Sequence, residues 1–336
     1  MNYKIFKGFL ATLVFVLPIP LAIVSMGIGY IKIPPAEILQ VTYSKFFGEI
    51  SGDLKVYETV IFNIRLPRIL LAFLVGTALA VSGAVMQSMF RNPLVEPYIL
   101  GISSGAAFGA ALAVGLGVIF LTQTLAFTFG MLSVFLAYTL AKTKGEIPVV
   151  SLVLTGIIVT AFFSALTSLI KYFVDPHDVA AIVYWIMGSF AYAKWENLKI
   201  APMILVPILL TFAMSWRLNV LSLGDEEAKA LGVKVNRERF VFLCLATFAT
   251  SSAVSVSGII GWVGLLIPHI VRLAFGVDNR IVIPLSASLG GSFMIFADNI
   301  ARSAFSFELP ISVLTTILGA PIFMFLVRRR AKRVWS

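Results

Sequence analysis

Charged side chains inside otherwise apolar segments are the first candidates for chemistry in this sequence. Asp298 and Arg302 stand four residues apart, a spacing that brings two side chains together on one face of a helix. Burying an ionisable group among apolar residues is costly, so such groups mark proton or ion pathways unless they neutralise one another. The opposite signs of the two charges favour an ion pair over a proton relay.

Two arginines, Arg65 and Arg68, precede another apolar segment. Their side chains can extend to lipid headgroups, or they can attract an anionic cargo. Arginines that flank apolar segments are common, and we therefore prefer the headgroup interpretation.

Metal ligands and nucleophiles are scarce. His177 stands in the segment Asp175-Pro176-His177-Asp178, which we interpret as a solvated loop, and His269 follows Pro268 in an apolar run, which is typical of a packing residue. Cys244 is the only cysteine, so an intramolecular disulfide is excluded. The motifs GxxxxGK[ST], HExxH and paired CxxC are all missing. We therefore predict no catalytic residue, no metal site and no cofactor bound by this chain.

Hydroxyl side chains recur in two apolar segments. They are Ser164, Thr167 and Ser168 in one, and Ser312, Thr315 and Thr316 in the other. Such hydroxyls can line a translocation pathway, or they can donate to the backbone of their own helix. Both interpretations stay open.

The composition identifies the elements that must position these residues. Of 336 residues, 59% are hydrophobic and 12% charged, and the mean hydropathy is +0.98. Soluble domains carry about 25% charged residues, so a soluble enzyme, a disordered chain and a disulfide scaffold are excluded. The net charge of +10 indicates basic cytoplasmic loops rather than binding to nucleic acid.

Uncharged stretches long enough to span a bilayer predict an all-α polytopic membrane protein with ten transmembrane helices. The stretches are Gly8–Ile31, Ile69–Phe90, Pro97–Ala141 (two helices), Ile147–Ile170, Ile200–Trp216, Phe240–Val271 (two helices), Ile281–Ala297 and Leu309–Val327. The two helices in Phe240–Val271 either extend past the charged ends of that stretch or meet in a turn buried within the protein. Val179–Ala193 predicts a short re-entrant or interfacial helix before the sixth span.

These spans form one transmembrane domain over residues 1–336, with no linker that would divide it. If the N-terminus is cytoplasmic, most of the 26 basic residues fall on the inner side. The bias places both termini in the cytoplasm of a multi-pass inner-membrane (plasma-membrane) protein.

One inner loop, residues 217–239, is longer than the others and holds five basic and four acidic residues. Asp225, Glu226 and Glu227 are typical of the first turn of a helix, and Gly232 can end that helix. The loop is either a solvated connection or a docking element for a soluble partner.

Several segments, in order, resemble permease subunits of type II ABC importers, the family for ferric siderophores, haem and cobalamin. The segments include Arg65-Leu66-Pro67-Arg68, Arg91-Asn92-Pro93-Leu94, Trp185-Ile186-Met187-Gly188, the docking loop from Leu223-Gly224 to Leu231-Gly232, Gly261-Trp262-Val263-Gly264, Asp278-Asn279-Arg280 and Glu308-Leu309-Pro310. The series runs from Arg65 to Pro310, a separation of 245 residues.

The resemblance implies a homodimeric permease in membrane lipid, with two soluble ATPase subunits and an extracytoplasmic binding protein. ATP and Mg would be bound by the ATPase, and the permease would not be an enzyme. The residues implied for coupling to the ATPase are Gly224, Glu227, Ala228, Leu231 and Gly232. Asn92 and Leu94 match part of a cytoplasmic gate, and a second gate segment would fall near Pro148 to Val150, where this sequence is less polar than the family.

The sequence leaves three alternatives to chelate import. An oxyanion such as molybdate or tungstate is a second cargo for the same fold. A gradient-driven secondary transporter or channel is disfavoured because buried acids are scarce. A membrane-embedded enzyme is disfavoured because the spans hold no convergent set of His, Asp or Glu.

Overall fold

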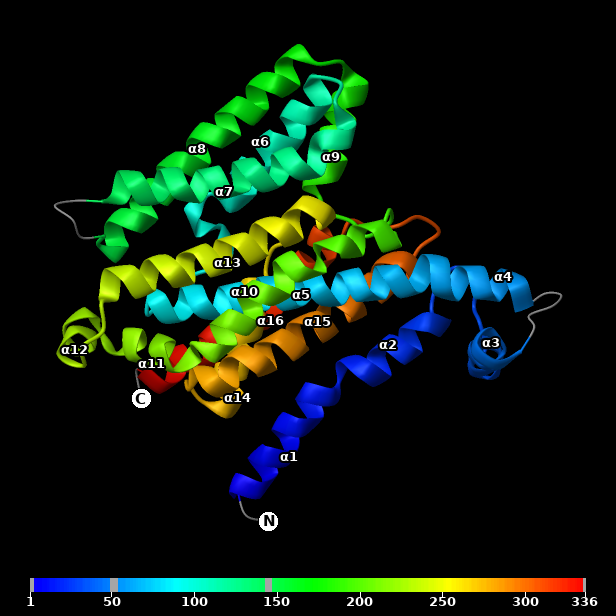
Figure 1. Cartoon of the computed structure of the whole chain (residues 1–336), viewed down its shortest axis with the longest axis horizontal. Helices are drawn as coiled ribbons and strands as arrows, with labels where there is room; N and C mark the ends of the chain where they lie inside the picture. The colour runs from blue at the N-terminus through cyan, green and yellow to red at the C-terminus, as the bar shows by residue number, and fades with distance from the viewer. Residues whose placement is uncertain (1–2, 49–53, 143–146, 335–336) are drawn as a thin grey trace.

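The computed structural model describes residues 3–48, 54–142 and 147–334, and within these ranges it consists of helices joined by turns, without a strand. Three long helices form the centre: α5 (Leu66–Met89), α13 (Val235–Ser257) and α15 (Asn279–Ser303). Figure 1 shows α13 and α15 on either side of α5, and α5 packs against both of them. The core therefore lies around α5, because 89% of the residues in the most apolar 18-residue stretch of Leu54–Met89 are buried.

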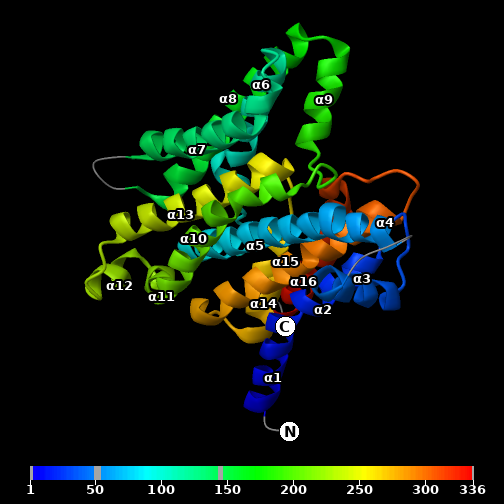
Figure 2. The same ribbon diagram turned by 45° about the vertical axis from the view of Figure 1, so that its right-hand side comes forward.

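The remaining elements surround this centre in two groups. Those before α5 are α1 (Tyr3–Val16), α2 (Pro18–Gly27), α3 (Pro35–Phe47), α4 (Leu54–Glu58) and the π-helical turn η1 (Thr59–Arg65). Those after it are η2 (Pro97–Leu100), α6 (Ile102–Gly115), η3 (Ile119–Leu121), α7 (Thr122–Ala141), α8 (Val149–Phe173), α9 (Pro176–Ile186), η4 (Trp195–Ile200), α10 (Ala201–Ala213), α11 (Ser215–Leu223), α12 (Asp225–Ala230), α14 (Val263–Phe275) and α16 (Ile311–Val334). Figures 1 and 2 show α6, α7 and α8 as a layer beyond α13, and α1 and α2 on the other side of the centre.

Small residues allow the central helices to approach closely. A Cβ atom added to Gly76 of α5 would collide with the backbone of Gly290 in α15, and one added to Gly83 would collide with Gly264 in α14. Small residues at such crossings let backbones pack where lipid offers no hydrophobic driving force. In the same way, Gly105 and Gly109 of α6 lie against the α7 backbone.

Within the described residues, seven helical segments are long and apolar enough to span a membrane, and α6, α14 and Ile311–Leu326 of α16 are shorter apolar helices. The all-helical membrane fold is thus confirmed, while the count of ten spans stays a prediction. An 11-residue helix, α9, lies where the sequence predicts a short helix. Both alternatives for α13 and α14 are met, because the two helices extend past Arg239 and Arg272 and the turn between them is buried, with Ile260 1% exposed.

Two parts of the chain differ from the predicted connections. The segment between the first two spans is not merely a charged loop, because it contains α3 and α4; Pro35 and Glu37 at the start of α3 are a local helix signal. The first span is divided at Pro18 into α1 and α2. The two termini, with residues 1–2 and 335–336, and Lys144 lie outside the described residues.

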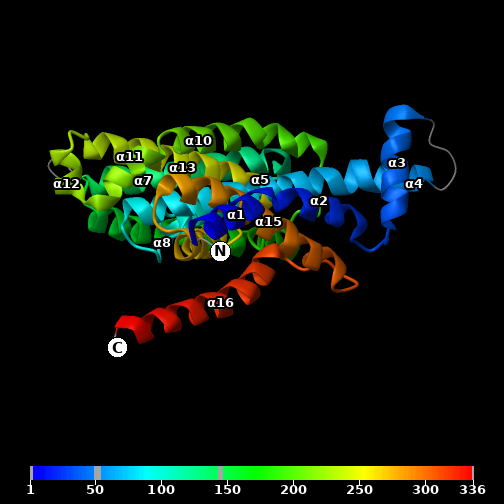
Figure 3. The same cartoon turned by 90° about the horizontal axis from the view of Figure 1, so that it is seen from below.

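The last helix, α16, stands apart from the others. Figure 3 shows it leaving the bundle toward its C-terminal end. Its early turns pack on α14 and α15, and Gly319 lies under the Trp262 side chain. Apolar side chains farther along, including Ile317 and Met324, are 62% and 70% exposed.

Candidate coupling surface and charged clusters

The short helix α12 begins and ends at glycines, as its sequence predicts. Gly224 has φ +147° and ψ 162°, a backbone conformation that excludes most other residues. Gly232 has φ +79°, and the amide of Val233 donates to the Ala228 carbonyl at 3.0 Å, which closes the C-terminal turn. The predicted docking element is therefore a defined helix projecting at the end of the bundle in Figure 1.

Arg239 of α13 fixes α12 to two other elements. Its guanidinium donates to Asp225 Oδ1 at 2.7 Å and to the Ile147 carbonyl at 3.0 Å. The Arg239 side chain is 5% exposed, so this cation is buried with partners that satisfy it. A force on α12 is therefore transmitted directly to α13 and to the start of α8.

The residues implied for coupling divide into buried and exposed positions. Ala228 is fully buried and packs into the central core, and Gly224 is also buried. Glu227, Leu231 and Gly232 are exposed, and Leu231 is 60% exposed. An exposed leucine at the tip of a rigid helix offers a soluble partner an apolar contact.

The turn after α5 lies next to this helix. Asn92 and Leu94 are exposed in that turn, and the Asn92 side chain accepts from the Leu94 amide at 2.9 Å. Arg91 has φ +49°, and its guanidinium lies 3.3 Å from the place a Cβ of Gly224 would occupy. The two segments that the sequence implies for gate and coupling are thus neighbours in space.

A polar cluster connects α5, α11, α14 and α15 at the same end. Asn279 Oδ1 accepts from Ser88 at 2.9 Å and from Arg272 at 3.2 Å, and its backbone amide donates to Asn219 at 2.7 Å. Asp278 begins α15 by accepting from the Arg280 amide at 3.0 Å. The Arg280 guanidinium beside Asp278 holds the pKa of that carboxyl well below its usual range, with a further contribution from Asn219.

A second charged cluster, the Arg68 cluster, lies at the other end of α5 and comprises Arg68, Asp298, Arg302 and Glu308. Arg68 Nη2 lies 2.7 Å from Asp298 Oδ1 and 2.6 Å from Glu308 Oε1. The Arg68 side chain is 8% exposed and that of Asp298 is 1% exposed. The predicted headgroup role of Arg68 is therefore wrong, because its guanidinium forms ion pairs with two carboxylates inside the protein.

Of the predictions for the residues beside Arg68, the Asp298–Arg302 ion pair is confirmed and the headgroup position of Arg65 is wrong. The intrahelical pair of Asp298 and Arg302 is present at 3.6 Å, but Arg68 is the closer partner of Asp298. Arg65 is 4% exposed and donates to the backbone carbonyls of Met26 and Ile31, so it is not at the headgroups either. Both arginines join segments far apart in sequence, for which no local pattern exists.

The six hydroxyl residues occupy different environments. Thr167 and Thr315 are buried and donate to backbone carbonyls of Phe163 and Ser312. Ser164, Ser168 and Thr316 are exposed on this chain, and Ser312 is half-buried. Among the described residues, no three His, Cys, Asp or Glu side chains are grouped to hold a metal ion.

The described helices that are long and apolar enough to cross a bilayer define a polytopic membrane protein. Residues 15–329 match the model of the FecCD transport family. The chain belongs to this family, whose members include permease subunits of type II ABC importers, transporters rather than enzymes.

Individual relatives differ in cargo. The chain is 42% identical to the molybdate import system permease MolB of Haemophilus influenzae over 91% of each chain. It is 39% identical to the cobalamin import system permease BtuC of Halobacterium salinarum, over 84% of this chain and 77% of that one. Among solved structures it resembles a metal-chelate type ABC transporter in an inward-facing conformation, with TM-score 0.86 and 38% identity over 96% of this chain and 99% of the other.

Proposed function

We propose that this protein is the membrane subunit of an ATP-driven importer that moves a metal chelate of the siderophore, haem or cobalamin class into the cytoplasm. The observation that carries the proposal is α12: a rigid helix with an exposed leucine, tied by Arg239 to α13 and adjacent to the Arg91–Leu94 turn. Closing of a partner ATPase can shift the membrane helices only through a contact that differs between two states. Such a helix supplies that contact.

The partners follow from the same proposal. Two copies of a soluble ATPase, which carries ATP and Mg, dock on α12 through Glu227, Leu231 and Gly232, with Gly224 and Ala228 shaping the helix. An extracytoplasmic binding protein delivers cargo to the opposite end, where α3 and α4 lie. In this orientation both termini are cytoplasmic, and residues 1–336 act as one domain with ten spans.

A homodimer explains the poorly covered helices. On α8, Ile158 is 61% exposed and Phe162 is 55% exposed, and α16 leaves the bundle with its own apolar side chains exposed. A second copy would cover these faces around a shared pathway. Ser164, Ser168 and Thr316 are then the hydroxyls best placed to line it, Ser312 less so, and Thr167 and Thr315 shape their helices instead. Asn92, Leu94 and the segment near Pro148 to Val150 would form the cytoplasmic gate.

Docking is tested with Leu231→Asp, co-expressed with the partner ATPase. We expect loss of ATPase co-purification, because docking would remove the charged aspartate from water and bury it in an apolar contact, which is costly. Leu116→Asp is the matched control, since Leu116 is 66% exposed at the end of α6. Retention of the ATPase by the Leu231 variant at the level of this control would refute the docking assignment.

A molybdate-type oxyanion is the second candidate cargo, because MolB is among the similar relatives. Proteoliposomes containing the permease, its ATPase and its binding protein would be offered labelled cobalamin, a ferric siderophore, haem and molybdate in separate reactions. We expect ATP-dependent accumulation of a chelate. Accumulation of molybdate alone would replace the chelate assignment while keeping the importer, and uptake driven by an ion gradient without ATP would overturn both.

A further inference from the structure

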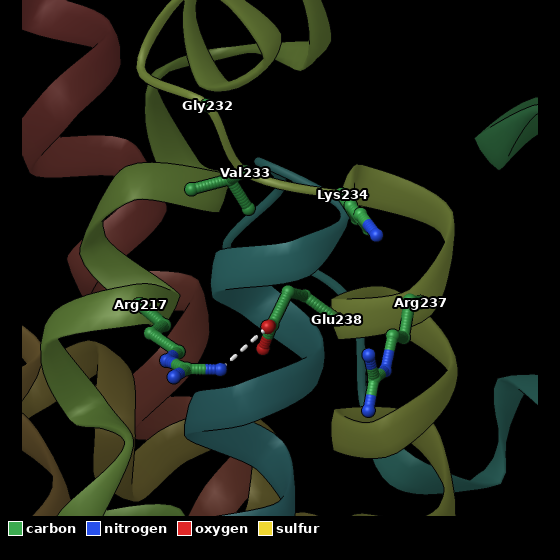
Figure 4. Close-up of a pocket in the computed structure, with 6 residues that line it drawn as sticks. All are labelled: Arg217, Gly232, Val233, Lys234, Arg237 and Glu238. Carbon is green, nitrogen blue, oxygen red and sulfur yellow. Dashed lines mark hydrogen bonds and ion pairs between the residues drawn. The ribbon is translucent and has the colours of Figure 1, made fainter.

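A basic cavity of about 310 Å³ lies between α11 and the start of α13, beside the docking helix. Figure 4 shows the six residues that line it, among them Arg217, Lys234, Arg237 and Glu238. Arg217 reaches from α11 to Glu238 Oε1 at 2.7 Å. Glu238 is thus paired with Arg217, whereas the side chains of Lys234 and Arg237 point away from this carboxylate in Figure 4 and have no ion-pair partner in the described part of the chain. The surplus positive charge favours an anion.

Apolar surfaces lead from this cavity toward the membrane on two sides. On α10 and α11 the exposed side chains Leu209, Phe212 and Trp216 are 63%, 48% and 58% exposed, and Trp216 directly precedes Arg217. An exposed tryptophan next to an arginine at the end of an apolar stripe is typical of the membrane–water interface. The cavity therefore lies at headgroup depth.

The second apolar surface begins one turn of α13 beyond Arg237. A groove of about 90 Å³ between α7 and α13 is lined by apolar side chains that include Tyr138, Phe240 and Cys244. The Tyr138 and Phe240 rings contact each other with centroids 4.9 Å apart. Phe240 and Cys244 follow Arg237 at spacings of three and seven residues, so they continue the same helix face.

We infer that the cavity binds the headgroup phosphate of an anionic phospholipid, whose acyl chains lie on the Trp216 stripe and in the α7–α13 groove. Lys234 and Arg237 bind the phosphate, and Arg217 orients Glu238 away from it. The volume is within the range of small-ligand sites, about 300–1,000 Å³. A free phosphate or an acidic protein segment would use the cations but leave both apolar surfaces unexplained. The inference requires only membrane insertion, and it does not depend on the cargo or on the ATPase.

Because Gly232 and Val233, which follow α12, also line the cavity, a bound lipid would hold the base of the docking helix. Anionic lipid would then support coupling as well as stability. This consequence separates a site from nonspecific attraction between a basic protein and an acidic membrane.

The experiment uses the full chain in vesicles of phosphatidylcholine with brominated phosphatidylglycerol or brominated phosphatidylcholine. Quenching at Trp216 is obtained as the difference between the wild type and Trp216→Phe. We expect the anionic lipid to be selected, and Lys234→Gln/Arg237→Gln to reduce this selectivity about tenfold to thirtyfold. Lys194→Gln/Lys199→Gln, which removes two exposed cations at η4, beside η1 at the other end of the bundle, is expected to retain it.

Four outcomes would overturn the inference. They are equal quenching by both lipids in the wild type, unchanged selectivity in the double variant, an equal loss in the control variant, and displacement of the lipid by millimolar inorganic phosphate or by a hexaglutamate peptide. The last would reassign the cavity to free phosphate or to an acidic protein. None of these outcomes bears on ATPase docking through Leu231, so the two proposals fail separately.

Discussion

The two ends of α5 place their charges in opposite ways. At one end Arg68 and Asp298 are almost completely buried and are held by several hydrogen bonds within the chain. At the other end, near α12, most charged side chains are exposed; Arg217 is 54% exposed and Glu226 is 86% exposed. Only Arg239 is buried there among the ion-paired basic residues that the structure describes. One end is built as a closed internal cluster and the other as an accessible surface.

This contrast indicates that the two ends of α5 have different roles. A buried ion pair is costly to form and more costly to break, so the Arg68 cluster fixes α5, α15 and the segment before α16 relative to one another. The α12 end retains charges that a partner or a lipid headgroup can reach. A transporter driven from outside its own chain needs such a surface, and it needs the far end of the helices to respond as a unit.

Breaking the Arg68 cluster should have the largest effect. Asp298→Ala leaves Arg68 and Arg302 facing each other inside the protein, and we expect a loss of about 3–5 kcal/mol in unfolding free energy. Glu308→Gln should cost less, because the Glu308 side chain is 29% exposed and water can replace it. Denaturant unfolding in detergent measures both, and equal losses would show that burial does not set the size of the loss within the Arg68 cluster.

Arg239 tests the one buried cation at the other end. Arg239→Met removes its bonds to Asp225 and Ile147 while keeping an apolar side chain, and we expect a loss of about 1–3 kcal/mol. Faster hydrogen exchange at α12 should accompany it. Arg217→Met is the control, since Arg217 is 54% exposed. If α12 exchanges no faster in the Arg239 variant than in the control, Arg239 is not what fixes the helix.

Gly224 sharpens the comparison within α12 itself. In Gly224→Ala, an alanine must adopt φ +147°, and its Cβ atom would also collide with the Glu227 carboxylate. We expect the unfolding free energy to fall by about 1–3 kcal/mol. Gly232→Ala has φ +79° and open space around the added atom, so its cost should be near 1 kcal/mol. Circular dichroism melts and ATPase co-purification would rank the two. The reverse ranking would contradict the assignment of the Gly224 backbone as the more restricted.

The sequence predicted local features better than distant ones. The start and end of α12 were predictable because acidic residues and glycines act within a single turn. The role of Arg68 was not, because Asp298 lies 230 residues away and only the fold brings the two together. Helix α3 lies between the first two predicted spans, where hydropathy gives no signal, although Pro35 and Glu37 are typical of a first helical turn. The lipid cavity also needs α11 and α13 side by side.

Lowering the pH should reduce the unfolding free energy slightly through Asp278, at the α12 end of α5. Its carboxyl has a pKa below the unfolded value, mainly through the hydrogen bond from Arg280. The stability it contributes is therefore complete above the ordinary pKa of aspartate, about 3.9, and is lost as the pH falls toward the lower folded value. Because the Asp278 side chain is 34% exposed, solvent screens the pair, and we expect less than about 1 kcal/mol. Asp278→Asn should therefore flatten the acid limb of a plot of stability against pH slightly, without changing stability in the Arg68 cluster. An unchanged acid limb would mean that the exposed Asp278–Arg280 pair at the α12 end contributes nothing to folding stability.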